Sequence, residues 1–197
     1  MERENLIYQV GDCTLLIRED RIDSRPYSFS SHPDEPVLRF LIRQMAGLGV
    51  DRSFSQWLAS LRPGDEVGIG TPFGWFRPGG DQEVWFATGT GVSPFLAALR
   101  GARPVPPLAF LIGVREPSEA VWRSWLEQRC PVRWAFSRQA EQGGTPARVT
   151  DFAEHVPVGD KIRYFLCGNQ RMIRSVAASL GHRGVLASQI HEELFFQ

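Results

Sequence analysis

The chain of 197 residues has few cysteines and no long apolar run, and each absence excludes a class of protein. Its three cysteines, Cys13, Cys130 and Cys167, are odd in number and far apart, so we expect no disulfide framework and favour a reducing compartment. No C-x-x-C pair or ferredoxin-like spacing occurs, which argues against a metal or iron–sulfur centre on this chain. Because no apolar run reaches bilayer length and residues 1–5 are charged, we expect no membrane span or export signal, and hence a cytoplasmic protein.

Net charge is also absent, since 22 basic residues balance 22 acidic ones. A nucleic-acid partner is therefore not indicated, because polyanions attract proteins with an excess of positive charge. Hydrophobic residues make up 43% of the chain, which is enough apolar material for two modest cores. We therefore expect two small domains.

The order of predicted strands and helices changes near residue 80. Before it, we expect strands over 6–10, 13–17, 26–30, 37–43 and 66–70, with one helix over 55–61. After it, strands and helices alternate, which is typical of a doubly wound parallel sheet. The strands are expected near 83–88, 108–114, 132–137, 162–168 and 185–190, and the helices near 94–100, 118–128, 150–155 and 170–180. The polar, turn-rich stretch 77–81 separates the two patterns, so we predict domains over 1–80 and 81–197.

A glycine-rich turn joins the strand near 83–88 to the following helix and reads Gly89-Thr90-Gly91-Val92-Ser93-Pro94. The glycines permit a tight turn and a close backbone approach to a ligand, and Pro94 suits the first turn of a helix. Free N–H groups at the start of the helix then face an anion such as a pyrophosphate. The same kind of turn also serves many α/β domains simply to reverse the chain, so by itself it leaves both readings open.

Two further segments are ambiguous when taken singly. The first, Arg25-Pro26-Tyr27-Ser28, offers a phosphate fork, a flat aromatic face and a hydroxyl donor, which a flavin needs, but it also fits a half-buried strand. The second runs from Cys167 to Met172 after an apolar strand, and the carboxyl end of a parallel strand is where open α/β sheets bind ligands. Cys167 is equally consistent with a small buried thiol.

Together, the three segments resemble the R-x-Y-S, G-T-G-x-[ST]-P and C-G-x-x-x-M signatures of the ferredoxin–NADP(+) reductase superfamily. The resemblance extends to residues 63–67, to residues 70–76 and to the C-terminal Glu193-Leu194-Phe195-Phe196. It implies an antiparallel FAD-binding β-barrel over 1–80 and an NADP-binding α/β domain with a five-stranded sheet over 81–197. It also implies that hydride passes from NADPH to bound FAD, and that electrons pass on to a ferredoxin, a flavodoxin or a redox subunit.

The resemblance assigns the flavin site residue by residue. Arg25 would bind the pyrophosphate of FAD, Tyr27 would stack on its isoalloxazine ring, and Ser28 would hydrogen-bond near N5. The other expected FAD contacts are Pro26, Ile42, Ser53, Phe54, Ser55 and Thr90.

For the nucleotide, the resemblance assigns Ser137 and Arg138 to the 2′-phosphate and so favours NADP(H) over NAD(H). Cys167 would approach C4 of the nicotinamide, and Phe195 or Phe196 would cover the flavin until the nicotinamide displaces it. The other expected nucleotide contacts are Gly89, Thr90, Gly91, Gly113, Arg115, Gly168 and Met172. The expected catalytic residues are Tyr27, Ser28, Cys167, Glu193, Phe195 and Phe196.

One departure concerns the first strands of the barrel. The segment from Tyr8 to Leu16 resembles the family's p-G-Q-[YF]-x-x-L strand, yet only seven residues precede Tyr8, so we expect the family's usual first hairpin to be absent. We expect either an abbreviated open barrel or completion of the sheet by another chain, for example in a homodimer, because a free sheet edge must be paired or protected. Two alternative functions stay open: a reductase that takes free flavin as a substrate, and a non-catalytic nucleotide-binding subunit of a larger electron-transfer complex.

Overall fold

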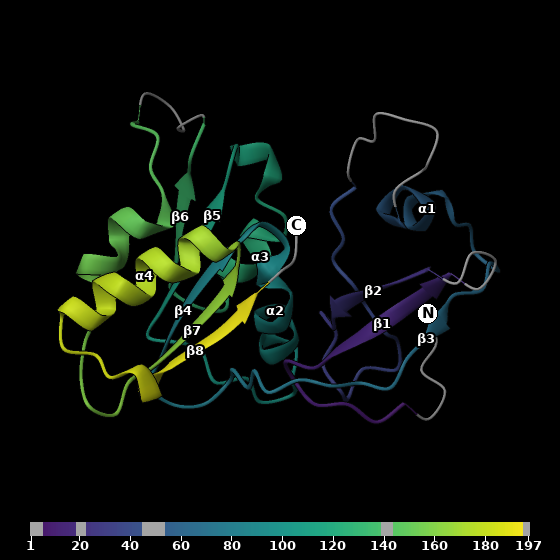
Figure 1. The fold of residues 1–197 in the computed structure, drawn as a ribbon, viewed down its shortest axis with the longest axis horizontal. Helices are drawn as coiled ribbons and strands as arrows, with labels where there is room; N and C mark the ends of the chain where they lie inside the picture. The colour runs from purple at the N-terminus through teal and green to yellow at the C-terminus, as the bar shows by residue number, and fades with distance from the viewer. Residues whose placement is uncertain (1–5, 19–22, 45–53, 139–143, 195–197) are drawn as a thin grey trace.

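The computed structural model describes residues 6–18, 23–44, 54–138 and 144–194. These residues form two sheets that lie side by side, a three-stranded antiparallel sheet and a five-stranded parallel sheet flanked by helices (Figure 1). The segment between them in the sequence runs along one side of the molecule from the small sheet to the large one (Figure 1). Among the described residues, no helix has both the length and the apolar character to cross a bilayer.

The small sheet has β1 (Cys13–Arg18) at its centre, between β2 (Asp23–Ser28) and β3 (Gly68–Ile69). Both neighbours run antiparallel to β1, and the register places Cys13 opposite Ser28 and Thr14 opposite Tyr27. Helix α1 (Phe54–Ser60) lies near β2, where the rings of Phe54 and Tyr27 stack with their centroids 6.2 Å apart. This part has a small core of its own, in which Tyr8 stacks on Phe29 at 4.0 Å.

Two expected strands of this part are wrong. Residues 6–10 and 37–43 form no strand, and Phe40 makes only an isolated bridge to Phe29. Side chains occupy backbone groups that a ladder would use, which is how short polar residues interrupt a sheet. The Ser31 hydroxyl accepts the Arg39 N–H at 3.1 Å, and the Asp12 carboxylate accepts the Gln9 N–H at 2.8 Å.

The large sheet has the strand order β6-β5-β4-β7-β8, with every neighbouring pair parallel. Its strands are β4 (Glu83–Thr88), β5 (Ala109–Val114), β6 (Val132–Phe136), β7 (Arg163–Gly168) and β8 (Ile190–Leu194). The expected five-stranded parallel sheet is confirmed, but its last strand lies at 190–194 rather than 185–190. Gln189 explains this shift, because its side chain bonds to the backbone of Leu186, Gly159 and Ile162 and holds η5 (Ala187–Gln189) as a turn.

Helices cover both faces of this sheet, as expected for a doubly wound fold (Figure 1). Along β4, Val84 and Phe86 face the core beneath α4 (Gln170–His182) and the 3-10 helix η4 (Val149–His155), whereas Trp85 and Ala87 face α2 (Ser93–Leu99) and α3 (Arg123–Glu127). Period-two alternation along a strand buried on both sides produces this division. The helix expected over 118–128 is shorter, because Trp122 has a left-handed φ of 66° and separates α3 from η3 (Pro117–Glu119).

A buried carboxylate ties the segment between the two sheets to the large sheet. Glu83 has no exposed surface and accepts hydrogen bonds from the N–H groups of Gly79 and Gly80 at 2.9 Å, from the Trp85 indole at 2.7 Å and from Arg163 at 2.7 Å. Buried charges are stable only when they are paired and hydrogen-bonded in this way. The residues just before β4 therefore have a fixed path, and the domain division at residue 80 stays a proposal.

Candidate functional site

The glycine-rich turn forms the short 3-10 helix η2 (Gly89–Val92) between β4 and α2, and Pro94 lies in the first turn of α2. Gly91 packs against the end of β7, because a Cβ at this position would lie 2.4 Å from the Cys167 carbonyl oxygen. No side chain fits in that space. The turn and the Cys167-Gly168 segment, which the sequence predicts to share a site, are therefore in direct contact.

A second link joins the same two strand ends. The Thr88 hydroxyl accepts hydrogen bonds from the Asn169 backbone N–H at 3.1 Å and from its side-chain amide at 3.0 Å. The Asn169 side chain also caps α4 by accepting the Met172 N–H at 2.9 Å. Gly168, with φ of 142°, must be glycine here, since a Cβ would lie 2.1 Å from the Thr88 hydroxyl oxygen. The Met172 side chain is buried in the core beneath α4, so its predicted nucleotide contact stays a prediction.

Cys167 and Glu193 lie side by side at the ends of β7 and β8. The Cys167 side chain is fully buried, and burial raises the pKa of its thiol well above the ordinary value, so it stays protonated. Burial also raises the pKa of Glu193, while a hydrogen bond from Cys13 and the charge of Arg77 act in the opposite direction. The end of the parallel sheet thus presents a neutral thiol beside a partly buried carboxyl group.

Cys13 connects the corner formed by Cys167 and Glu193, at the ends of β7 and β8, to the small sheet. Its sulfur lies 3.7 Å from a carboxylate oxygen of Glu193 and 3.4 Å from the Phe73 carbonyl oxygen. Burial, followed by the negative charge of Glu193, raises the pKa of Cys13 to about 12. Since Cys13 is opposite Ser28 in the β1–β2 register, the predicted flavin strand lies next to the Cys167–Glu193 corner.

The predicted flavin residues follow β2 in two sets. Arg25 and Tyr27 point to one face and Pro26 and Ser28 to the other, because successive side chains of a strand alternate. Tyr27 is half-buried, and burial raises the pKa of its hydroxyl. The Arg25 guanidinium lies 5.8 Å from the centroid of the Phe54 ring and donates to the Ser24 carbonyl at 2.7 Å. It also forms an ion pair with Asp23, and 56% of its side chain is exposed. An aromatic face and an accessible cation therefore stand together.

Other predicted flavin contacts divide between the two parts of the site. Ser55 is buried on α1 beside Phe54, while Ile42 and Thr90 line a cavity described below. Ser53, Phe195 and Phe196 lie outside the described residues. Their predicted roles stay predictions.

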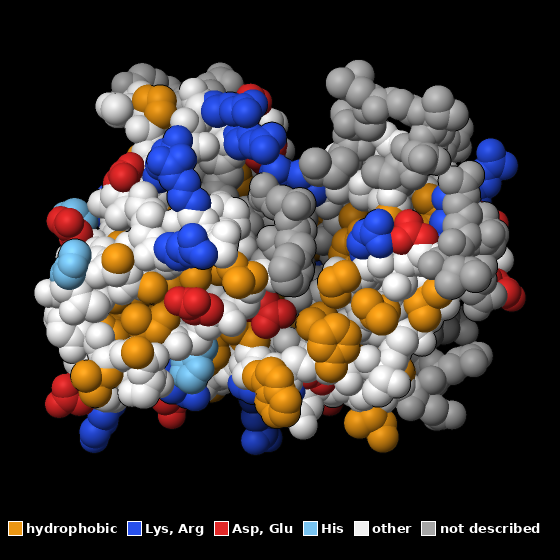
Figure 2. Space-filling model, in the orientation of Figure 1, with side chains coloured by type: hydrophobic (Ala, Val, Ile, Leu, Met, Phe, Trp, Pro, Cys, Tyr) orange, Lys and Arg blue, Asp and Glu red, His pale blue; other side chains and the backbone are white. Residues whose placement is uncertain are grey.

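Predicted nucleotide residues meet at the carboxyl ends of β5 and β6. Ser137 donates its N–H to the Val114 carbonyl at 3.0 Å, and Arg138 donates its N–H to the Arg115 carbonyl at 2.9 Å. The side chains of Arg115 and Arg138 are both exposed, and Gly113 pairs with Thr88 across β4 and β5. Figure 2 shows arginine side chains gathered over these strand ends. The carboxyl ends of β5 and β6 are therefore suited to an anionic ligand.

A cavity of about 280 Å³ lies between residues 41–43 and the strand ends. Its lining includes Ile42, Gly89 and Thr90, which the sequence predicts, and Arg43, Glu119 and Trp134, which it does not. Arg43 lies 3.4 Å from Glu119 and reaches the glycine-rich turn, since a Cβ on Gly89 would be 3.6 Å from its guanidinium. The sequence could have indicated Arg43 through its position directly after Ile42, a predicted FAD contact.

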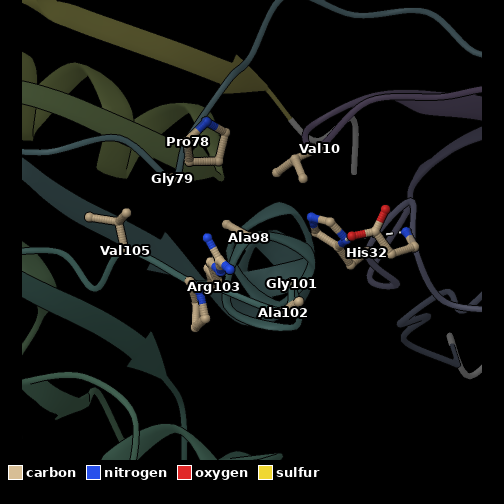
Figure 3. A pocket seen from close by; sticks show the side chains of 11 residues that line it. Val10, His32, Pro78, Gly79, Ala98, Gly101, Ala102, Arg103 and Val105 are labelled. Atoms are coloured by element: carbon tan, nitrogen blue, oxygen red, sulfur yellow. Dashed lines mark hydrogen bonds and ion pairs between the residues drawn. The ribbon is translucent and has the colours of Figure 1, made fainter.

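A separate cavity of about 380 Å³ lies at the opposite end of α2 from the glycine-rich turn. Figure 3 shows His32, Val10 and Pro78 around it, with Arg103 and Gly101 from the segment that follows α2. None of the predicted site residues lines it. We therefore place the candidate site at the strand ends and not in this larger space.

Exposed aromatic side chains lie close to the Cys13–Glu193 contact. Phe73 pairs with Cys13 through two backbone hydrogen bonds of 2.8 and 2.9 Å, and its side chain is 49% exposed. Trp75, two residues further on, is 95% exposed. Apolar side chains also gather over the small sheet on the face shown in Figure 2. Surface aromatics of this size often mark a place where another protein docks.

No protein-family model matches the chain. Among curated proteins, the chain is similar to ferredoxin–NADP reductase B of Sorangium cellulosum (strain So ce56), with 30% identity over 193 aligned residues that cover 87% of this chain and 78% of that protein. It is also 29% identical, over 184 residues, to the electron transfer component of toluate 1,2-dioxygenase from Pseudomonas putida. The match covers 87% of this chain, which spans about half, 54%, of that relative's length.

Among solved structures, the fold is similar to a ferredoxin NADP+ reductase from Neisseria gonorrhoeae with bound FAD and NADP. The TM-score is 0.79 at 21% sequence identity, and the match covers 99% of this chain and 90% of the other. This likeness confirms the fold class expected from the sequence, a small β-domain followed by an α/β domain.

Proposed function

Because the chain belongs to the ferredoxin–NADP(+) reductase family of flavoprotein reductases, we propose that it binds FAD along β2, oxidises NADPH at the strand ends of the parallel sheet and passes electrons to a redox protein. One observation carries the proposal, namely a continuous set of contacts that joins the three motifs. Ser28 is opposite Cys13, Cys13 contacts Glu193, Glu193 is beside Cys167, and Cys167 contacts the turn at Gly91.

The residues present fit a flavin. Tyr27 offers an aromatic face, Arg25 offers an exposed guanidinium for a pyrophosphate, and Ser28 brings a hydroxyl next to the Cys13–Glu193 contact. Ile42 and Thr90 line the cavity on the other side, and Ser53, Phe54, Ser55 and Pro26 complete the proposed FAD set. FAD, when bound, accepts hydride from the nicotinamide and releases electrons singly.

The proposed nucleotide site extends from the glycine-rich turn to the ends of β5 and β6. Gly89 and Gly91 let the backbone approach a pyrophosphate, and Arg115, Ser137 and Arg138 supply donors for a 2′-phosphate. Ser137 and Arg138 place a hydroxyl beside a guanidinium, which suits a 2′-phosphate and favours NADP(H) over NAD(H).

The protein contributes to the chemistry by positioning the reactants and by keeping charge and solvent away from them. Cys167 stays neutral because it is buried, so it adds no charge next to the nicotinamide position. Glu193 is held by Cys13 at the corner between the two sheets. Phe195 and Phe196 follow Glu193 in the sequence, and we propose that they cover the flavin. Holding two reactants in line is a large source of rate acceleration in such sites.

The electron acceptor is proposed to be a ferredoxin, a flavodoxin or a redox subunit that docks over Phe73 and Trp75. Both side chains are exposed and lie on the segment that contacts Cys13, so a partner seated there would approach the proposed flavin. A homodimer that completes the small sheet is an alternative occupant. Sedimentation of the flavin-loaded protein distinguishes a dimer from a monomer that awaits its partner.

A matched pair of arginine variants tests the proposed flavin site. Arg25→Ala removes the phosphate donor and should weaken FAD binding by roughly tenfold or more, because hydrogen bonds between charged groups contribute about 1.5–3 kcal/mol. Arg62→Ala removes an exposed arginine two residues beyond the end of α1, outside the proposed FAD set, and should retain FAD. The measurement is flavin content after gel filtration, together with NADPH-driven ferricyanide reduction. Equal flavin content in both variants would refute the assignment of Arg25.

A reductase that uses flavin as a substrate is the second candidate. The observation that favours it is the small size of the first sheet, in which β3 has only two residues. Such a sheet offers little surface for the adenosine half of FAD. Loss of flavin during gel filtration, with NADPH-dependent reduction of added flavin preserved, would select this candidate over the first.

A further inference from the structure

One carboxylate oxygen at the edge of the nucleotide site receives two donors. Glu119 ends η3, just beyond β5, and its Oε2 accepts the Arg115 N–H at 3.0 Å. The same oxygen lies 3.4 Å from a guanidinium nitrogen of Arg43. The two side chains are about one-third exposed, at 32% for Glu119 and 35% for Arg43. The ion pair therefore spans from the β-domain to the end of the parallel sheet while water still reaches it.

Arg43 is placed to meet a phosphate that arrives at the glycine-rich turn. Its guanidinium lies 3.6 Å from the position of a Cβ on Gly89, and both residues line the cavity of about 280 Å³ together with Thr90 and Glu119. Arg115, whose N–H is also bonded to Glu119, is among the proposed nucleotide residues. Glu119 thus satisfies, with its own negative charge, two donors at the place where an anionic ligand would use them.

We propose that Glu119 is an internal competitor that lowers the affinity of the site for the pyridine nucleotide, an inference that rests on the proposed function. When the phosphates bind, Arg43 exchanges the carboxylate for a phosphate oxygen, and the remaining charge of Glu119 repels the ligand. Exposed ion pairs contribute little, so the effect on the dissociation constant is about two- to fivefold. Weaker binding of the oxidised nucleotide also speeds its release after each turnover.

The test compares Glu119→Gln with Glu116→Gln in the flavin-loaded protein. Glutamine keeps the size of Glu119 and an oxygen that can accept the Arg115 N–H, but it removes the charge. Glu116→Gln removes the same charge three residues away, where the structure gives the side chain no contact with Arg43. The measured quantity is the dissociation constant of NADP+, from calorimetry. We expect it to fall about two- to fivefold in Glu119→Gln and to change clearly less in Glu116→Gln.

Ionic strength gives a second readout that a merely structural role would not move. When NADP+ binds to the wild-type protein, the ion pair between Arg43 and Glu119 is replaced by one between Arg43 and a phosphate, so this contact should add little to the salt dependence of binding. In Glu119→Gln, Arg43 has no carboxylate partner before NADP+ binds and gains an ion pair with the phosphate, so salt should weaken binding more steeply. In an Arg43→Gln background, Glu119→Gln should lose most of its effect, because the coupled partner is gone.

The possible failures are distinct. An unchanged or raised dissociation constant in Glu119→Gln, with wild-type protein that binds NADP+, overturns the inference and leaves the proposed function intact. An equal gain in Glu116→Gln also overturns it, since the effect would then be a general one of charge. Wild-type protein that binds flavin but no nucleotide overturns both.

Discussion

Replacing Gly91 by alanine tests whether the contact between the two strand ends organises the site. The added Cβ would lie 2.4 Å from the Cys167 carbonyl oxygen, 2.7 Å from its carbonyl carbon and 2.9 Å from the Gly168 Cα. All three atoms are backbone, so no side-chain rotation relieves the overlap and the ends of β4 and β7 must separate. Overpacking of this kind costs about 1–3 kcal/mol. For a chain of this length each kcal/mol lowers the melting temperature by about 2–4 °C.

Gly181→Ala is the matched control, because a Cβ there meets nothing within 4 Å and the position lies in the last turn of α4. Replacing glycine by alanine where the native conformation suits alanine should stabilise the protein by about 0.4–1 kcal/mol. Thermal unfolding followed by circular dichroism should therefore move in opposite directions for the two variants. NADP+ binding should be lost or weakened at least tenfold only in Gly91→Ala, since a 1 Å displacement of positioning groups has effects of this order. A Gly91→Ala protein that melts and binds like the wild type would refute the reasoning.

Three further predictions concern other parts of the molecule. Glu83→Gln should destabilise the fold by about 3–5 kcal/mol in urea unfolding, because it leaves Arg163 and three other donors around a buried group without their anion. Cys13→Ala removes a hydrogen bond that lowers the pKa of Glu193. A limb of the kcat/KM–pH profile that reflects the titration of Glu193 should therefore move to higher pH. If no limb moves, the ionisation of Glu193 does not control the rate. Trp75→Ala should raise KM for a ferredoxin or flavodoxin roughly fivefold or more and leave ferricyanide reduction unchanged; equal effects on both acceptors would exclude Trp75 from docking.

Local patterns in the sequence predicted the parallel sheet well. The apolar runs at β4, β5 and β7 are largely buried on both faces, which makes them continuous and easy to identify. Helix α4 was equally clear, since Met172, Ile173, Val176 and Leu180 repeat at helical spacing behind the Asn169 cap. The position of the site followed from these elements, because the motifs lie where the strands end.

The remaining features depend on contacts between distant residues. Residues 37–43 are rich in the branched and aromatic residues that favour a strand, but the Ser31 hydroxyl accepts the Arg39 N–H, and no local pattern encodes that bond. The start of β8 depends on hydrogen bonds from the Gln189 side chain to Gly159 and Ile162. Helix α3 is shortened by the left-handed conformation of Trp122, and no glycine in the sequence indicates that conformation. For the same reason the sequence identified Ile42 but not the neighbouring Arg43.

The central claim is that one chain holds a flavin and a pyridine nucleotide in reacting positions, and a single spectroscopic experiment tests it. The visible absorption of the purified protein, supplemented with FAD and freed of excess by gel filtration, is recorded before and after anaerobic addition of NADPH. We predict a flavin band that bleaches on addition of NADPH, and more slowly with NADH at the same concentration. A protein that retains no flavin, or a flavin band that neither nucleotide bleaches, would contradict the account.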